Sequence, residues 1–119
     1  MAQVRIDLGV SREVAESGAA AHAITKWLGP NAWSTTPTLS QITPRGKGWL
    51  CVCSDGLWNY ASAPELLADT LRMAIGALDA DPAVDNPAQA WQVCAEMVAW
   101  ANAQGGRDNI TVGLVRHDP

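Results

Sequence analysis

Two aspartates stand directly beside apolar runs of the sequence. Asp55 follows the run 49–53 within Ser-Asp-Gly, and Asp108 precedes the run 110–115 within Arg-Asp-Asn. If the two runs form adjacent antiparallel strands, both carboxylates lie at the same edge of one sheet. Two hard oxygen donors there, with Gly56 permitting close approach, suit Mg²⁺ or Mn²⁺. Ordinary turn chemistry is the competing interpretation, because Asp in such pairs commonly hydrogen-bonds the neighbouring backbone.

The apolar runs predict the strands that would position these aspartates. Residues 49–53 are almost continuously apolar, which predicts a strand covered on both faces. Residues 110–115 are rich in β-branched side chains and predict a second strand. A third is expected at 38–43, at a sheet edge because Pro37 has no amide donor. The turn at 44–48 would allow this segment to pair with 49–53 as a hairpin.

Helical patterns account for most of the remaining sequence. Residues 9–28 predict an irregular, mostly helical region, with a second short helix over 21–28 that stops at Gly29-Pro30. Ser62 with Glu65 forms a capping-box pattern before apolar positions at helical spacing.

A further helix is expected to begin at Asn86-Pro87. Its apolar stripe should include Ala88, Trp91, either Cys94 or Ala95, Val98 and Ala101. Core packing is the interpretation preferred over a partner groove.

Length and composition restrict the classes of protein. The chain has 119 residues, 48% hydrophobic and 17% charged, which fits one globular domain. A formal net charge of -4 without a basic cluster argues against a nucleic-acid partner. No apolar run approaches the roughly 18 residues of a membrane span, and residues 1–10 lack the apolar region of a secretory signal. These features predict no membrane association and a cytoplasmic location.

Cysteine and tryptophan usage gives two further expectations. Cys51 and Cys53 lie on one face of the strand 49–53, and without a second pair they are interpreted as core residues rather than metal ligands. With Cys94 the count is odd, so the thiols are expected to be reduced. Most of the six Trp should anchor a core or an interface.

Other candidate sites are weaker. His22 is interpreted as a helix-packing residue, with a contact or protonation role as the alternative. Arg107 is taken as a solvated loop charge. Asp79, Asp81 and Asp85 hint at a calcium loop, but the Gly and terminal Glu of that pattern are missing, so a solvated loop is preferred.

The ordered motifs resemble one known family. Trp49–Trp58, then a capped helix near Glu65, then 105–112 (Gly-Gly-Arg-Asp-Asn-Ile-Thr-Val), look like the C-terminal part of the metal-dependent protein serine/threonine phosphatases, the PPM or protein phosphatase 2C family of bacterial type. The segments 11–15 and 21–29 resemble that family's flap and the helix after it. The resemblance covers essentially the whole chain.

The resemblance implies a fold and a chemistry. The expected class is α+β, part of an α-β-β-α sandwich in which antiparallel sheets are flanked by helices, with a flap-like segment at 9–28. Two or more Mg²⁺ or Mn²⁺ ions would hold a water that attacks phosphoserine or phosphothreonine of a protein substrate. Asp55 and Asp108 match two of the family's metal-binding aspartates, and no further catalytic residue is assigned.

The resemblance also identifies what is missing. The family's N-terminal half supplies an Asp-Gly pair that bridges the metals, another metal-binding Asp and an Arg that binds phosphate. Residues 1–119 are therefore expected to be a single partial domain that is inactive alone. The alternatives are a non-catalytic remnant that binds other proteins, or one chain of a split phosphatase. Exposed sheet edges would favour a homodimer.

Overall fold

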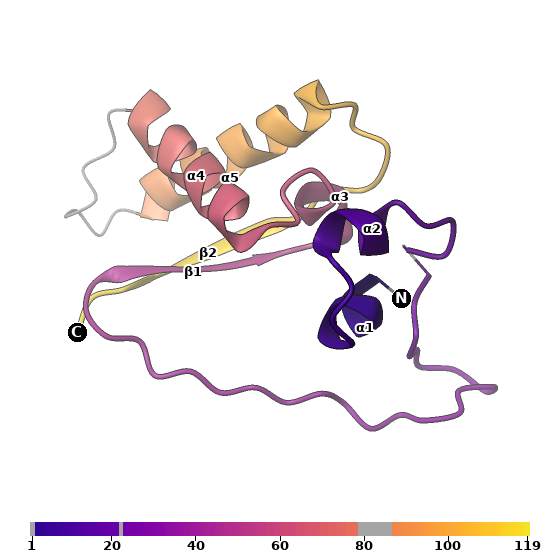
Figure 1. Cartoon of the computed structure of the whole chain (residues 1–119). Helices are drawn as coiled ribbons and strands as arrows, with labels where there is room; N and C mark the ends of the chain where they lie inside the picture. The colour runs from indigo at the N-terminus through magenta and orange to yellow at the C-terminus, as the bar shows by residue number, and fades with distance from the viewer. Residues whose placement is uncertain (1, 22, 79–86) are drawn as a thin grey trace. The chain divides into compact units, whose positions relative to one another are not determined.

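Helices and one two-stranded antiparallel sheet make up the regular structure of the described residues. The computed structural model describes residues 2–21, 23–78 and 87–119. These form two compact units, Met1–Gln41 and Ile42–Pro119. Helices α1 and α2 belong to the first unit, and β1, α3, α4, α5 and β2 belong to the second (Figure 1). The α+β class expected from the sequence is confirmed.

Unit 1 contains two short helices, α1 (Ala2–Asp7) and α2 (Arg12–Glu16). Arg5 Nη1 lies 3.4 Å from the carbonyl oxygen of Val14 and donates a hydrogen bond to it. The helix predicted at 21–28 is wrong, since no helix occurs in 23–28. Isolated helices of this length are marginal in water. Nothing compensates here, because the apolar side chains of Ile24 and Leu28 are exposed rather than packed.

The sheet of unit 2 joins β1 (Gly48–Cys53) to β2 (Val112–His117). The strands are antiparallel, and their register pairs Gly48 with His117 and Cys53 with Val112. The strand and hairpin predicted at 38–43 are wrong, because this segment contains no strand. Prolines at both of its ends lack amide donors, and its Leu39 and Ile42 side chains stay exposed.

Helices cover one face of this sheet. The helices α4 (Pro64–Ala77) and α5 (Pro87–Ala103) lie on the same side of it, and the short α3 (Asp55–Trp58) continues from the end of β1 (Figure 1). The buried residues of the core come from these three helices: Leu57, Ala74, Val93, Met97 and Ala101. Residues of both strands, β1 and β2, pack against this cluster from the sheet side.

The other face of the sheet is bare in the described structure. Burial alternates along β1, so that Cys51 and Cys53 are half-buried while Leu50 and Val52 are 52% and 64% exposed. The prediction that β1 is covered on both faces is therefore wrong. The expectation that both cysteines face the core is confirmed.

Helix starts and stripes differ in detail from the sequence patterns. The N-cap of α4 is Ala63 rather than Ser62, and no side chain caps the helix. Pro64 occupies the first turn of the helix, where its missing amide proton needs no acceptor. In α5 the buried positions are Val93, Met97 and Ala101, and Trp91 is 71% exposed. The apolar stripe predicted through Trp91 is therefore shifted around the helix.

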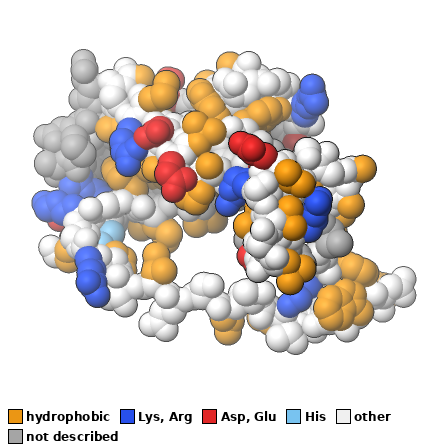
Figure 2. Space-filling model, viewed as in Figure 1, with side chains coloured by type: hydrophobic (Ala, Val, Ile, Leu, Met, Phe, Trp, Pro, Cys, Tyr) orange, Lys and Arg blue, Asp and Glu red, His pale blue; other side chains and the backbone are white. Residues whose placement is uncertain are grey.

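Most of the tryptophans lie at the surface. Trp49 and Trp100 are half-buried, and the other four are exposed, namely Trp27, Trp33, Trp58 and Trp91. Hydrophobic side chains lie at the surface among polar and charged ones (Figure 2). Trp100 packs against the core, and for the exposed tryptophans the expected anchoring of an interface stays a prediction.

Among the helices at 2–21, 23–78 and 87–119, none has the length and apolar character needed to cross a bilayer.

Candidate functional site

Asp55 and Asp108 lie at the same end of the β1–β2 ladder. The ladder ends with the pair Cys53 and Val112, and beyond it the amide of Ser54 donates to the carbonyl oxygen of Thr111 at 3.0 Å. Asp55 follows as the first residue of α3, and Asp108 lies in the loop that leads into β2. The antiparallel adjacency expected from the sequence is confirmed. The metal-binding role of the two carboxylates stays a prediction.

Ser54 ties the two sides of this end together. Its hydroxyl Oγ donates a hydrogen bond to the carbonyl oxygen of Asn109 at 2.9 Å. Ser54 Oγ in turn accepts a hydrogen bond from the amide of Thr111 at 3.0 Å. The Ser-Asp-Gly and Asp-Asn segments are thus joined by a side chain that belongs to the first of them.

Gly56 brings the two segments into backbone contact. A Cβ atom at this position would lie 2.3 Å from the carbonyl oxygen of Asn109 and 2.9 Å from its carbonyl carbon. Real Cβ atoms do not approach backbone so closely, so only glycine fits. The close approach expected of Gly56 is directed at the neighbouring loop. This backbone contact fixes the position of the main chain at Asp55 relative to the main chain at Asp108.

The end of α5 shapes the loop that carries Asp108. The amide of Gly106 donates a hydrogen bond to the carbonyl oxygen of Ala101 at 3.3 Å, and the amide of Gly105 donates one to the carbonyl oxygen of Asn102 at 3.0 Å. This pair of bonds is of the Schellman type. Gly106 has a φ of 51°, and a Cβ there would lie 2.6 Å from Oδ1 of Asn102. The left-handed backbone therefore favours glycine where the chain leaves the helix.

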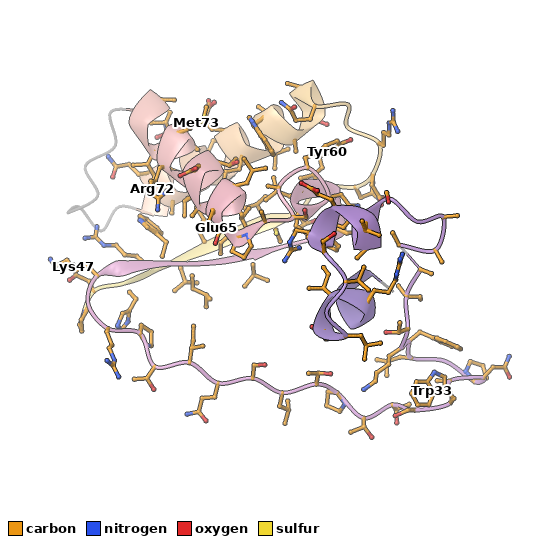
Figure 3. All side chains as sticks on the ribbon, viewed as in Figure 1. Trp33, Lys47, Tyr60, Glu65, Arg72 and Met73 are labelled. Carbon is orange, nitrogen blue, oxygen red and sulfur yellow. The ribbon has the colours of Figure 1, made fainter. Side chains whose placement is uncertain are left out.

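Tyr60 anchors the same loop from the other side. Its hydroxyl accepts a hydrogen bond from the amide of Arg107 at 3.3 Å. The Tyr60 side chain lies near α3 and the end of α5, at the opposite end of the sheet from Lys47 (Figure 3). Arg107 itself is exposed, as the interpretation of a solvated loop charge requires.

The two carboxylates differ in their local bonding. Oδ1 of Asp108 accepts a hydrogen bond from the amide of Asn109 at 2.7 Å. Turn chemistry therefore uses part of the Asp108 carboxylate, as the competing interpretation of the sequence proposed. Both Asp55 and Asp108 are exposed and accessible to an ion from solvent.

The donor set limits what a metal would find here. Within the described ranges, no group of three or more His, Cys, Asp or Glu side chains is placed to hold a metal ion. Two carboxylates are nevertheless a sufficient protein contribution for one Mg²⁺ that keeps several waters. Two aspartates do not supply a bridged pair of metals, and their binding of a single hydrated cation stays a prediction.

The cysteines are packing residues in this structure. Cys51, Cys53 and Cys94 are half-buried free thiols. Burial raises the pKa of Cys51 to about 11, with Cys53 and Cys94 as further contributors. Burial also raises the pKa of Cys53 and of Cys94. Such thiols stay protonated at neutral pH, whereas metal ligation and nucleophilic chemistry require thiolates.

Two of the weaker candidates cannot be placed. His22 and the acidic segment 79–85 lie outside the described residues.

One polar cluster was missed by sequence reasoning. Asp118 pairs with Nζ of Lys47 at 3.1 Å and with Nη2 of Arg116 at 3.1 Å, at the end of the ladder opposite Asp55. Arg116 shares the parity of Val112 and Leu114, so it lies on the helix-covered face. The sequence signal that could have found this cluster is Arg116, a charged residue at the next inward-facing position after Val112 and Leu114.

Comparison with known proteins adds no assignment. No protein-family model, no curated protein and no solved structure matches this chain.

Proposed function

We propose that the chain is the C-terminal part of the catalytic domain of a metal-dependent protein serine/threonine phosphatase of the PPM type. The observation that carries the proposal is the antiparallel β1–β2 pairing, which brings the Ser-Asp-Gly and Asp-Asn segments to one end. Helices α4 and α5 on one face of the sheet agree with the helix layer that the family resemblance implies.

Asp55 and Asp108 are the proposed metal ligands. Each offers an exposed carboxylate, and the contact of Gly56 with Asn109 fixes the backbone that carries them. When bound there, Mg²⁺ or Mn²⁺ would lower the pKa of a water ligand and offset charge on the phosphoryl group of a phosphoserine or phosphothreonine substrate. The chain's own part is to hold the cation at this end of the sheet.

The isolated chain is expected to be catalytically inactive. Two carboxylates do not bridge a metal pair, and the part of the family pattern that contains the bridging Asp and the phosphate-binding Arg has no counterpart here. We expect no turnover of a phosphothreonine peptide by the purified chain with Mn²⁺. Turnover above the rate in buffer with Mn²⁺ alone would contradict this expectation.

Paramagnetic Mn²⁺ provides the direct test of the metal site. Amide NMR signals of residues 54–56 and 107–110 should broaden first during a Mn²⁺ titration. Asp55→Asn and Asp108→Asn should each weaken this broadening about tenfold, because each removes an anionic ligand. Asp69→Asn is the matched control, since Asp69 is an exposed carboxylate on α4 that pairs with Arg72.

The control and the location of the signal decide the outcome. Asp69→Asn should leave the broadening at residues 54–56 unchanged. Broadening centred elsewhere, or equally weakened by all three variants, would remove the basis for the proposed function.

A non-catalytic interaction module is the second candidate. The observation that favours it is the bare outer face of the sheet, where Leu50, Val52 and Val115 are exposed. Analytical ultracentrifugation of the chain and of Val52→Lys tests whether this face binds a second copy of the chain. A dimer that Val52→Lys dissociates supports association through this face, and a folded monomer for both variants contradicts it.

A further inference from the structure

A hollow lies at the end of the sheet opposite the two aspartates. It has a volume of about 480 Å³ and is formed by the segment 42–48 with the adjoining ends of β1 and β2. This volume lies within the range of small-molecule sites, roughly 300–1,000 Å³. Its lining reaches the pair Leu50 and Val115, and three register pairs lie between that pair and Asp55, which separates the hollow from the proposed metal site.

Apolar side chains line part of the hollow. Ile42, Leu50 and Val115 contribute to it, and they are 76%, 52% and 61% exposed. Leu50 and Val115 are directly opposite each other in the register, so they form one continuous apolar surface across the two strands. Contact with an apolar ligand would remove this surface from water, which is favourable in proportion to the area covered.

Cationic residues gather around the same hollow. Arg45, Lys47 and Arg116 line it together with His117. These are three of the eight Lys and Arg residues of a chain whose formal net charge is -4. Asp118 is the acidic residue paired with them, and one carboxylate offsets only one of the three positive charges.

Arg116 is not fully satisfied by this carboxylate. Its side chain is only 6% exposed, and Nη2 bonds Asp118 while the buried Nη1 has no hydrogen-bond partner. Hydrogen bonds from Lys47, with the charges of Lys47 and Arg116, hold the pKa of Asp118 below its ordinary value. Because Arg116 lies on the helix-covered face, the exposed cations beside Leu50 and Val115 are those of Arg45 and Lys47.

We propose that this hollow binds a small organic anion with an apolar body. The hydrocarbon would cover Ile42, Leu50 and Val115, while a carboxylate or phosphate group would meet the charges of Arg45 and its neighbours. A bare inorganic anion lacks the apolar contact, and a neutral hydrophobe leaves the cations uncompensated. The positive charge and the apolar lining together therefore favour an organic anion over either of these two kinds of ligand.

Amide NMR titrations with four probes test this inference. Octanoate and octyl phosphate contain both parts of the ligand and differ only in the anionic group. Octanol and inorganic phosphate each contain one part. The first two should shift the amide signals of residues 46–50 and 115–117 saturably, and the last two should bind at least about tenfold more weakly. Stronger binding of octyl phosphate or of octanoate identifies the preferred head group.

Paired variants locate the site. Arg45→Gln should weaken octanoate binding about three- to tenfold, the effect of one charge-assisted contact. Arg72→Gln, which removes an exposed cation from α4, is the matched control and should have no effect. Val115→Asp places a negative charge within the apolar lining and should abolish binding, and Ile42→Ser provides the same test outside the strands.

Two results would overturn the proposal. One is that octanol binds as tightly as octanoate, which would make the anionic group irrelevant. The other is that octanoate shifts signals elsewhere in the chain, or that Arg45→Gln and Arg72→Gln change its affinity equally.

Discussion

The two ends of the β1–β2 ladder are held together by different interactions. At the aspartate end, the backbone of Gly56 lies against the backbone of Asn109. At the other end, the side chains of Lys47 and Arg116 share the carboxylate of Asp118. Backbone packing is short-ranged and indifferent to salt, whereas an ion pair with an exposed partner, such as Lys47 with Asp118, is screened and contributes little. The comparison indicates that the aspartate end is the geometrically fixed one, as a ligand-binding constellation requires.

The largest expected effect on stability comes from adding one methyl group, at Gly56, to the aspartate end of the ladder. Gly56→Ala would place Cβ 2.3 Å from the Asn109 carbonyl oxygen, so one segment must move. We expect a loss of about 3 kcal/mol in the free energy of unfolding, the upper part of the range for overpacking. Urea denaturation followed by circular dichroism measures this loss.

A second glycine provides the control for this substitution. Gly76 lies in α4, and a Cβ there would meet nothing within 4 Å. Gly76→Ala should stabilise the protein by about 0.5–1 kcal/mol, because alanine favours helix and restricts the unfolded chain. Equal effects of the two substitutions would contradict the special role of the Gly56 contact.

A smaller effect is expected from the hydroxyl that joins the two segments. Ser54→Ala removes both the bond to Asn109 and the bond from Thr111. We expect a loss of about 1 kcal/mol, since these bonds are partly replaced by water. Urea denaturation provides the measurement, with Ser40→Ala in the exposed coil of unit 1 as control. A Ser54→Ala protein as stable as the Ser40→Ala protein would show that backbone packing alone holds this end.

The smallest effect should come from the ion pairs at the opposite end. The pKa of Asp118 is lowered in the folded chain, chiefly by hydrogen bonding to Lys47. Its contribution to stability is therefore present above the unfolded-state value of about 4 and is lost as pH falls through the lower folded-state value. An NMR titration of the Asp118 carboxyl should show that added salt moves its pKa back toward the ordinary value. A pKa insensitive to salt would contradict the contrast between the two ends.

The strands and their pairing were predictable because several local signals agree. Residues 49–53 are almost continuously apolar, residues 110–115 are rich in β-branched side chains, and strong turn residues flank both segments. The segment 38–43 contains a similar local pattern and forms no strand. Local propensity therefore does not decide which segments pair, since cross-strand packing and burial determine whether a strand forms. Cys51 and Cys53 contact the core helices, whereas Leu39 and Ile42 remain exposed.

The candidate site was only partly predictable for a related reason. The position of Asp55 and Asp108 at one sheet end follows from strand order and direction alone. The contact of Gly56 with Asn109 does not, because it depends on how the loop after α5 docks onto α3. The pairing of Lys47 with Asp118 likewise requires the register, since these residues are 71 positions apart.

The distance along the chain between the two strands has a consequence for biosynthesis. Val112 follows its partner Cys53 by about sixty residues, and α3, α4 and α5 lie between them. A ribosome adding about 5–20 residues per second leaves β1 without its partner for about 3–12 s. During that interval the helices can form locally and shield the inner face of β1. Its hydrogen-bonding edge stays open to other nascent chains until the final strand emerges.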